Sequence, residues 1–475
     1  MLFNSFDFIL FYLIVLVVYY IPFIKKFQSI LLVLASFFFY AYNVPYLLGL
    51  LVVSLLINSL SSYYIFYGNF KRPKLISAAG VIINLGILSF FKYSPFIVDN
   101  FMSNNLNDKD SIASFLITIP LPIGISFYTF QGVSLLVDTF RDKELNKNTI
   151  GINKNLFKHI LDSSLYVSFF PQLIAGPIVK STFFMPQIKT KFFEDVNWEY
   201  VFKMLIIGYF LKIVIADNMK DITAFMQYPY FTTMSTGSLL SLVLAYNVQL
   251  FGDFAGYSII ALGLAASFGY TLEINFDFPF IAKNLSEYWR RWHITLYAWF
   301  NEYLYNPFVF RYRMHARKAV IGGLFLVFAL SGFWHGASWN YLIWGIVHGV
   351  VLILEIQFLR KIKVKETWYS NLLKRVVVFT FIAFCLILIK IQDFSEILHF
   401  LKCLFTNGGI EQSKLKFESY IFIYTLPVFL YHGYYLLSDE RKTKINKFQP
   451  IVFAIMLWLI IVNSGFANEF IYFQF

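Results

Sequence analysis

Two stretches of this sequence concentrate charged and polar side chains within apolar surroundings, and they decide how the chain is interpreted. The first reads Asn284-Leu-Ser-Glu-Tyr-Trp-Arg-Arg-Trp-His293-Ile-Thr-Leu, and the second reads Gly332-Phe-Trp-His335-Gly-Ala-Ser-Trp-Asn340. The second stretch is followed directly by the apolar run Tyr341 to Gly349. Ionisable groups at the depth of a membrane are costly and are functional candidates by default. These stretches are therefore the first place to look for a functional site.

The whole chain is far more apolar than a soluble domain. Of its 475 residues, 58% are hydrophobic and only 14% are charged, and apolar runs near the ~20 residues that a membrane-spanning helix needs recur throughout. The predicted spans lie near residues 6–23, 29–43, 46–67, 75–91, 113–137, 199–216, 236–252, 255–269, 319–334, 341–359, 375–390, 418–437 and 450–466. We expect an all-α polytopic membrane protein with about a dozen membrane helices. No polar stretch is long enough to fold separately, so residues 1–475 should form one integral membrane domain.

The basic residues indicate orientation in a membrane. The formal net charge of +12 would suggest nucleic-acid binding in a soluble protein, but the positive residues lie in short clusters between apolar runs, such as Lys25 and Lys26. We therefore expect no nucleic-acid partner. Basic loops alternate with a loop around Asp99, Asp108 and Asp110 that is acidic on balance. Because basic loops remain in the cytoplasm, we place the N-terminus outside.

Two segments interrupt the apolar runs. Between Leu165 and Pro177 the chain contains Pro171, Gly176 and Pro177, which disfavour a straight helix. Such a segment is tolerated at membrane depth where protein or a wet cavity satisfies the backbone, so we expect a re-entrant segment or a broken helix lining a cavity. The second interruption, Phe251-Gly-Asp-Phe-Ala-Gly-Tyr257, should split two spans and place Asp253 close to the membrane interior.

His335 lies at the predicted junction of two apolar helices, beside Ser338, Trp339 and Asn340. A helix break in hydrocarbon leaves backbone groups unpaired unless it faces a cavity. From the residues alone two alternatives stay open. His335 is either an active group in a cavity, or a core histidine that bonds a neighbouring carbonyl and holds the break together.

His293 follows a dense group of charges and indoles. If this piece is helical, Trp289 and Arg290 share the face of His293, and Glu287 pairs with Arg291 at i,i+4. Arginines and tryptophans are also the usual anchors at a membrane interface, which is the preferred interpretation for Trp289 and Trp292 and an open alternative for the arginines.

The remaining five histidines are predicted to be structural or solvated. His348 stands in a small-xxx-small pattern, Gly345 to Gly349, which allows close helix packing. The other four are His159, His315, His399 and His432.

Several chemistries lack their signature in this sequence. The two cysteines, Cys385 and Cys403, form no CxxC pair, and no GxSxG elbow, GxxxxGK[ST] loop or HExxH motif occurs. We therefore expect no metal site and no bound cofactor, and no serine hydrolase of the soluble type, ATP-driven pump or zinc protease.

The motifs resemble those of the membrane-bound O-acyltransferase (MBOAT) family, in the bacterial branch with alginate and peptidoglycan O-acetyltransferases. The resemblance is carried by Phe251–Tyr257, Ser286-Glu-Tyr-Trp-Arg-Arg-Trp-His293, Tyr303-Leu-Tyr-Asn-Pro307 and Phe333-Trp-His-Gly-Ala-Ser-Trp-Asn340, with support from Ile123–Gln131, Phe169–Pro177, Met1-Leu-Phe-Asn-Ser and Tyr472–Phe475. It implies a helical bundle with re-entrant segments around a central tunnel. The implied parts are N-terminal helices at 1–112, a catalytic core at about 113–360 and C-terminal helices at 361–475.

The resemblance also implies roles for single residues. His335 matches the invariant histidine of the family and His293 its companion, so both are assigned to catalysis. We assign Trp334, Asn340, Arg290 and Asp253 to substrate binding.

A neutral imidazole can take the proton of an acceptor hydroxyl as it attacks a thioester. The oxygen that gains charge then needs donors, which His293, a Trp indole or Asn340 would supply. The three choices stay open.

The implied activity is transfer of an acetyl group from a cytoplasmic thioester, acetyl-CoA or another, toward hydroxyls of a polysaccharide or of peptidoglycan at a bacterial cytoplasmic membrane. A separate extracytoplasmic acetyltransferase is the expected partner. Two alternatives are D-alanyl transfer to teichoic acid, and a transporter or channel in which His335 and Asp253 move protons. One departure from relatives is visible, because Asn301-Glu302 and Phe308–Arg313 replace an Arg-Asp pair and a Gly-Gly-Asn turn.

Overall fold

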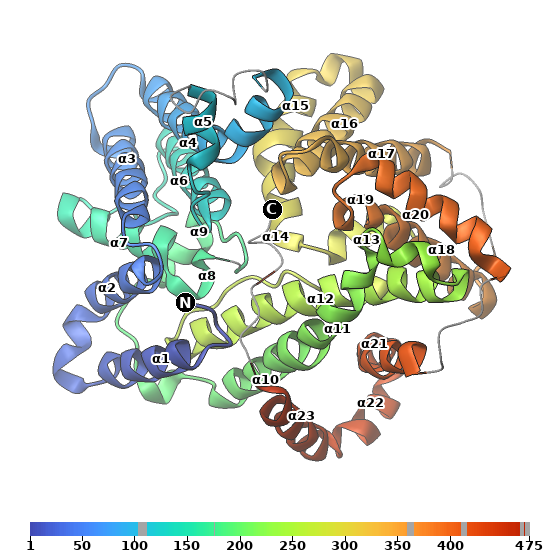
Figure 1. Cartoon of the computed structure of the whole chain (residues 1–475). Coiled ribbons are helices and arrows are strands. Elements are labelled where there is room, and N and C mark those ends of the chain that lie inside the picture. Colours follow the sequence, from blue (N-terminus) through green and yellow to red (C-terminus); the bar gives the residue numbers. More distant parts are fainter. Residues whose placement is uncertain (103–111, 175, 359–364, 410–415, 466–469, 471–475) are drawn as a thin grey trace. The chain divides into compact units, whose positions relative to one another are not determined.

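The computed structural model describes residues 1–102, 112–174, 176–358, 365–409, 416–465 and 470. Within these ranges the chain forms helices and one isolated antiparallel bridge, between Phe276 and Trp292, and no strand of a sheet (Figure 1). The all-α prediction is therefore confirmed. Asp108 and Asp110 of the predicted acidic loop, and the closing motif Tyr472–Phe475, lie outside the described residues.

Within the described residues, seven helical segments are long and apolar enough to cross a membrane, and the number rises to eight if the bent pair α22 (Asp439–Asn446) and α23 (Gln449–Asn463) forms one span. The seven are Pro22–Ala41, Leu47–Tyr67, Pro73–Phe101, Thr236–Ser267, Arg313–His335, Trp339–Gln357 and Trp368–Lys390. This is fewer than the dozen expected because several apolar runs are divided. The run 113–137 forms α5 (Ile112–Thr118) and α6 (Ile125–Glu144), separated by Pro120 and Pro122, which cannot donate backbone hydrogen bonds.

The chain forms two compact units, which are described separately. Unit 1 comprises Met1–Leu205 and Ser258–Glu273, and unit 2 comprises Ile206–Tyr257 and Ile274–Phe475. The single integral membrane domain predicted for residues 1–475 stays a prediction. The same holds for its division into three parts near residues 112 and 360.

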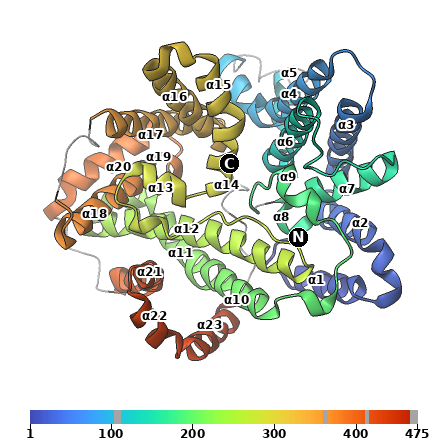
Figure 2. The ribbon, with the colours of Figure 1, turned by 180° about the vertical axis from the view of Figure 1, so that it is seen from behind.

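Unit 1 contains the N-terminal helices. They are α1 (Phe6–Tyr19), α2 (Gln28–Ala41), α3 (Leu47–Tyr67), α4 (Pro73–Phe101), α5, α6, α7 (Leu156–Ser168), α8 (Phe170–Leu173), α9 (Ser181–Phe184) and most of α10 (Trp198–Tyr209). Helices α3, α4 and α6 lie side by side in both views (Figures 1 and 2). Polar side chains join them, since Asn58 and Asn84 exchange amide hydrogen bonds of 3.2 and 2.8 Å. His159 contacts Ser62 at 2.8 Å and is buried, so its predicted structural role agrees with its place.

The break predicted near Pro171 is present. Helix α7 ends at Ser168 and the four-residue α8 follows. Side chains satisfy the freed groups, because the Phe170 amide donates to Ser36 Oγ (3.0 Å) and Gln172 Nε2 donates to the Tyr166 carbonyl (2.6 Å). The interruption is thus a broken helix held by protein contacts, and the cavity expected beside it stays a prediction.

Unit 2 contains the remaining helices. They are η5 (Phe210–Ala216), α11 (Asp217–Thr223), the first part of α12 (Thr236–Ser267), α13 (Leu285–Arg291), α14 (Ile294–Phe300), η9 (Asn301–Tyr305), α15 (Asn306–Arg311), α16 (Ala316–His335), α17 (Trp339–Gln357), α18 (Trp368–Cys385), α19 (Ile387–Lys390), α20 (Phe394–Thr406), α21 (Lys416–Tyr435), α22 and α23. The segments η5 and η9 are π-helical. Asn301-Glu302 lies in η9, and Phe308–Arg311 lies in α15.

The split predicted between residues 252 and 255 is wrong, because α12 runs unbroken for 32 residues from Thr236 to Ser267. Its glycines allow close packing. A Cβ on Gly252 would lie 3.0 Å from the Leu211 carbonyl oxygen, and one on Gly256 would lie 2.9 Å from the Lys212 amide nitrogen. The same approach gives Asp253 a cationic partner in Lys212, so a charged residue is accommodated without breaking the helix.

Candidate active site

The two apolar helices that flank His335 form a tightly packed pair. Helix α16 ends at His335 and α17 begins at Trp339, as the sequence predicts. Side chains at Gly332 and Gly345 would overlap the backbone of the opposite helix, and one at Gly336 would overlap the ring of Tyr341. The small residues therefore hold the two helices together, and His335 is fixed at the point where they turn.

His335 lies at the edge of a small cavity within unit 2. Its side chain is 8% exposed and meets the rings of Trp334 and Trp344 edge to face, at centroid distances of 4.9 and 5.4 Å. The cavity has a volume of about 30 Å³. Its other lining residues are Leu250, Tyr288, Trp289, Trp292, Tyr341, Trp344, His348, Ile382, Leu386 and Ile389. His335 is thus next to a small, partly open space with mostly apolar walls.

His293 is held by an irregular backbone. Helix α13 ends at Arg291, and His293 adopts a left-handed conformation with φ 46°. Such a φ is uncommon for a residue other than glycine. Two backbone hydrogen bonds stabilise it, from Ile294 to the Asn275 carbonyl (2.9 Å) and from Asp277 to the Arg291 carbonyl (3.0 Å). The condition for Trp289 and Arg290 to share a helical face with His293 is therefore not met.

The hydrogen bonds of His293 define which ring nitrogen carries the proton. Nδ1 lies 3.3 Å from Asn275 Oδ1, which also accepts from Thr295 Oγ1 at 2.6 Å. A carbonyl oxygen can only accept, so Nδ1–H donates and Nε2 of the neutral ring has a lone pair. Burial, reinforced by the proximity of His335, lowers the pKa of His293 well below its usual range. His293 is therefore a neutral hydrogen-bond acceptor at Nε2.

The structure brings the two predicted histidines together around one indole. The ring of Trp334 lies 4.9 Å from that of His335 and 6.4 Å from that of His293. All three side chains are buried. The rings of Phe254 and His293 meet edge to face at 4.7 Å. Of the predicted site residues, His335, His293 and Trp334 thus form one cluster.

Of the residues that line this cavity, only His335 was predicted as a site residue. His348 is 1% exposed, and its ring lies 4.6 Å from that of Trp344 and 5.2 Å from that of Trp289. The expected interfacial positions of Trp289 and Trp292 are wrong, because both side chains are buried. The missed signal is a stripe on α17, where Tyr341, Trp344 and His348 recur at helical spacing and all line the cavity.

A second and larger cavity of about 230 Å³ lies on the other side of Trp289. Its lining residues are Ser286, Trp289, Arg290, Tyr297, Asn301, Tyr305, Leu324, Val327, Phe328, Leu352 and Ile356. Trp289 is part of both linings, so this side chain forms a wall between the two spaces. Arg290 is exposed and brings a positive charge to the larger cavity.

Helix α13, which carries Trp289 and Arg290, is fixed by carboxylates. Glu355 on α17 is buried and accepts from the Leu285 amide (2.6 Å) and Ser286 Oγ (2.5 Å) at the start of α13. The predicted ion pair between Glu287 and Arg291 is present at 3.0 Å. The wall between the two cavities thus has a rigid support.

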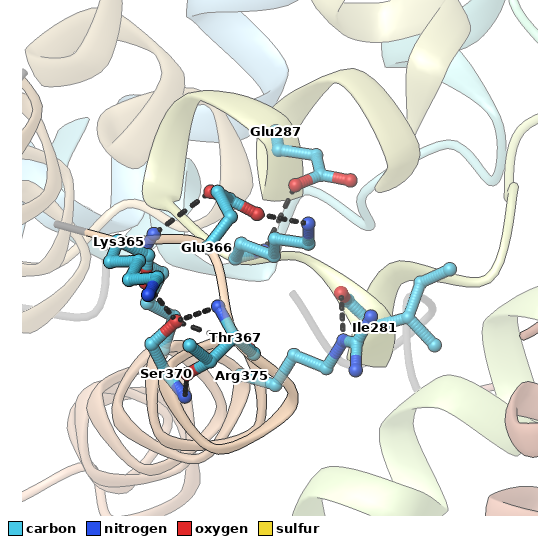
Figure 3. Close-up of polar contacts among 9 residues, drawn as sticks. Ile281, Glu287, Lys365, Glu366, Thr367, Ser370 and Arg375 are labelled. Carbon is cyan, nitrogen blue, oxygen red and sulfur yellow. Dashed lines mark hydrogen bonds and ion pairs between the residues drawn. The ribbon is translucent and has the colours of Figure 1, made fainter.

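A second set of contacts holds the segment that leads into α13. As Figure 3 shows, Arg375 and Glu366 reach this segment from the start of α18. Arg375 Nε donates to the Ile281 carbonyl (3.1 Å), and Glu366 pairs with Lys283 at 3.2 Å and Lys374 at 3.1 Å. Hydrogen bonds from Lys374 and Lys283 hold the pKa of Glu366 below its usual value.

Two predicted site residues are engaged elsewhere. Asn340 Nδ2 donates to the carbonyls of Ile391 (3.2 Å) and Gln392 (2.6 Å), which ties the start of α17 to the segment after α19. Asp253 pairs with Lys212 at 2.7 Å, and Lys212 also pairs with Asp217 at 2.7 Å. Neither Asn340 nor Asp253 is among the residues that line the two cavities. Their assignment to substrate binding stays a prediction without geometric support.

The described ranges contain no group of three or more histidine, cysteine or acidic side chains arranged to hold a metal ion. The cavity beside His335 holds two imidazoles and no carboxylate. The polar side chains of its lining are therefore imidazoles, indoles and the phenols of Tyr288 and Tyr341.

Fold and site together define a multi-pass helical membrane protein with a buried histidine pair beside an internal cavity. The sequence matches the membrane-bound O-acyltransferase family over residues 157–391. It is 35% identical to the peptidoglycan O-acetyltransferase of Helicobacter pylori over 418 residues, which cover 84% of this chain and 77% of that protein. The chain belongs to the MBOAT family and is an acyltransferase.

Two further relatives delimit the branch. The probable alginate O-acetylase AlgI of Pseudomonas aeruginosa is 30% identical over 405 residues, which cover 82% of this chain and 72% of that protein. The teichoic acid D-alanyltransferase of Bacillus subtilis is 31% identical over 276 residues, which cover 55% of this chain and 67% of that protein. The similarity to the acetyl-transferring relatives thus extends over much more of the chain.

Proposed function

We propose that this protein transfers an acetyl group from a cytoplasmic thioester, acetyl-CoA or another, toward hydroxyls of an extracytoplasmic polysaccharide or of peptidoglycan. The observation that carries the proposal is the place of His335, at the turn between α16 and α17 and on the wall of an internal cavity. A neutral imidazole is a suitable general base for an alcohol. A mostly apolar wall excludes water that would hydrolyse the thioester.

In the proposed reaction, His335 takes the proton of the acceptor hydroxyl as its oxygen attacks the thioester carbonyl carbon. A C–O bond forms, and the carbonyl π electrons move to the oxygen. When this tetrahedral intermediate collapses, the C–S bond breaks and the thiolate receives the proton from His335. His293 assists from the other side of Trp334, where its Nε2 accepts a hydrogen bond from the acceptor or from a bridging water.

The larger cavity suits the donor. Arg290 brings a positive charge to its lining, and Ser286 and Asn301 add polar groups, which together fit a polar and anionic thioester carrier. Trp289 separates this cavity from the one beside His335. We propose that the thioester end passes this indole to reach His335, and that the family's tunnel follows this route.

The proposed setting is a bacterial cytoplasmic membrane with the N-terminus outside. Basic clusters such as Lys25 and Lys26 would then lie in the cytoplasm. The expected partner is an extracytoplasmic acetyltransferase that completes delivery to the polymer. Support for a glycan acceptor comes from the peptidoglycan and alginate that the two relatives are named for.

The test uses purified full-length protein in lipid vesicles, radiolabelled acetyl-CoA, and peptidoglycan or polysaccharide fragments as acceptors. Wild type should form labelled ester, and His335→Ala should form none above background while keeping its yield and thermal unfolding temperature. Transfer by the His335→Ala variant at the wild-type rate would remove His335 from the chemistry. D-alanyl-thioester is the competing donor in the same assay, and its exclusive use would favour the teichoic acid alternative.

The transporter alternative requires Asp253 to exchange protons with its surroundings. Asp253 is buried at 1% exposure and forms an ion pair with Lys212, which disfavours that role.

A further inference from the structure

Acyl transfer needs hydrogen-bond donors for the oxygen atom that becomes negative, and two of the candidates named from the sequence are engaged otherwise. Asn340 directs its amide hydrogens to the carbonyls of Ile391 and Gln392. His293 donates Nδ1–H to Asn275, so its other nitrogen can only accept while the ring is neutral. The donors must therefore come from other residues, and an indole is the candidate that is left.

The cavity beside His335 contains such donors. The indole Nε1 atoms of Trp344 and Trp289 and both ring nitrogens of His348 are buried and have no hydrogen-bond partner among the described residues. All three side chains line the same cavity as His335. Leaving a buried donor unsatisfied costs about 1–3 kcal/mol. Three such groups around one space indicate a ligand, or ordered water in its absence, that accepts hydrogen bonds from them.

The size of the cavity agrees with a small acyl group. A single water needs about 10–15 Å³ of such space, and the cavity offers about 30 Å³. That is room for two or three groups the size of a water molecule, such as the carbonyl and methyl groups of an acetyl. A long acyl chain would need the indoles of Trp289 and Trp344 to move.

We propose that Trp344 and His348, together with Trp289, form the oxyanion-binding site of this acyltransferase. This inference rests on the proposed function. Trp344 contacts both imidazoles, at centroid distances of 5.4 Å from His335 and 4.6 Å from His348. Trp289 meets Trp344 at 5.7 Å and His348 at 5.2 Å. A carbonyl in this space is therefore close to the base and to the donors at once.

The division of labour follows from the side-chain chemistry. His335 accepts the proton of the hydroxyl, while the indole N–H groups and one N–H of neutral His348 donate to the carbonyl oxygen as it gains the electron pair of the broken π bond. No charge on His348 is required. When the C–S bond breaks, the oxygen returns to a carbonyl and these hydrogen bonds weaken. The donors thus act most strongly on the intermediate, which is the condition for catalysis.

The experiment compares variants that keep or remove a donor at constant shape. Trp344→Phe keeps an aromatic ring and removes the N–H, and His348→Leu removes both nitrogens, whereas His348→Gln keeps an N–H. We expect Trp344→Phe and His348→Leu each to lower kcat for acetyl transfer about 10²-fold, as removal of a single oxyanion donor does. KM for acetyl-CoA should change less than threefold, and His348→Gln should recover at least tenfold of the loss.

Matched controls separate this role from packing. Trp299→Phe and His432→Gln change an equally buried indole and imidazole that line neither cavity, and both should keep the wild-type kcat. A His348→Leu protein with wild-type kcat would overturn the proposal, as would equal losses in His348→Gln and His348→Leu at unchanged unfolding temperature. If His348→Leu does not fold, the kcat values of Trp344→Phe and His348→Gln test the proposal. Failure of the proposed function itself would give a different result, because wild-type protein would then form no ester that depends on His335.

Discussion

Two of the places where unit 2 buries polar groups differ in how these groups are satisfied. At Lys212, one ammonium pairs with Asp253 and Asp217 at 2.7 Å each, and the glycines of α12 bring the helices together around it. Around His335, the buried nitrogens of His348, Trp344 and Trp289 have no hydrogen-bond partner among the described residues. The first place has charges that neutralise one another, whereas the second has neutral donors that face a cavity.

This difference separates a structural site from a reactive one. Buried ions remain in a protein when close partners compensate their desolvation, and such a set resists change. Neutral groups with free hydrogen-bonding capacity cost less to bury and can bind a substrate atom. A substitution near Lys212 should therefore act on stability, and one near His335 on catalysis. The predictions below test this division, beginning with the largest expected effect.

The largest effect is expected for the base. His335→Ala should lower kcat about 10³-fold or more, because general base catalysis contributes ~10²–10⁴-fold and His335 is the proposed base. The thermal unfolding temperature should fall by no more than a few degrees. The measurement is initial-rate acetyl transfer together with thermal unfolding in the same detergent. If His335→Ala instead lowers the yield of folded protein, His335 has a structural role.

The second effect tests the other side of the comparison. Lys212→Ala leaves Asp253 buried without its cation, so unfolding free energy should fall by about 3–5 kcal/mol. The residual folded protein should keep a normal kcat per molecule. Lys212→Met combined with Asp253→Leu removes both charges and should recover much of the loss. Unchanged stability in Lys212→Ala would show that the ion set does not hold η5 against α12.

The sequence predicted the parts of this arrangement that depend on neighbouring residues. The turn at His335 follows from Gly336 and the polar residues beside it, and the break after Ser168 follows from Pro171 and the residues near it. It did not predict that Asp253 has a partner, because Lys212 lies 41 residues away and reaches it only through the close approach at Gly256.

His348 was assigned to packing for a similar reason. The pattern from Gly345 to Gly349 does mediate close helix contact, since a side chain at Gly345 would overlap the Phe328 backbone. The imidazole projects from the same turn of α17 toward a cavity whose other walls include residues of α12, α13, α18 and α19. A one-dimensional pattern identifies a helix face that packs closely, but the cavity exists only after distant helices assemble.

The third prediction concerns the companion histidine. His293→Ala should lower kcat about 10-fold to 100-fold, less than His335→Ala, because His293 contacts the reaction through its Nε2 lone pair alone. Asn275→Ala should give a similar but smaller loss by releasing the ring from its tautomer. Initial rates at saturating donor are the measurement. Full activity in both variants would show that the cluster around Trp334 contains only one working imidazole.

The fourth prediction is a pH dependence of stability. Burial lowers the pKa of His293 well below its value of ~6.5 in an unfolded chain. The unfolded state therefore binds a proton first as pH falls, so wild-type stability should decrease below about pH 6.5, by up to ~1.4 kcal/mol per pH unit, and stay constant above it. His293→Asn should lack this component. The check is the unfolding temperature of both proteins at pH 7.5 and at pH 5.5. The difference between wild type and His293→Asn should be smaller at pH 5.5 than at pH 7.5.

The smallest effects compare two carboxylates that support α13. Glu355 is buried and accepts from Leu285 and Ser286, so Glu355→Gln should cost about 1–3 kcal/mol of stability and reduce kcat by displacing Trp289. Glu366 is exposed to water between Lys283 and Lys374 (Figure 3), and Glu366→Gln should leave both unfolding temperature and kcat within experimental error. High salt screens exposed ion pairs, so Glu366→Gln should also have no effect on unfolding temperature or kcat at high salt. A larger effect from Glu366 than from Glu355 would mean that α13 is held from the α18 side, and the wall at Trp289 would then depend on surface charge.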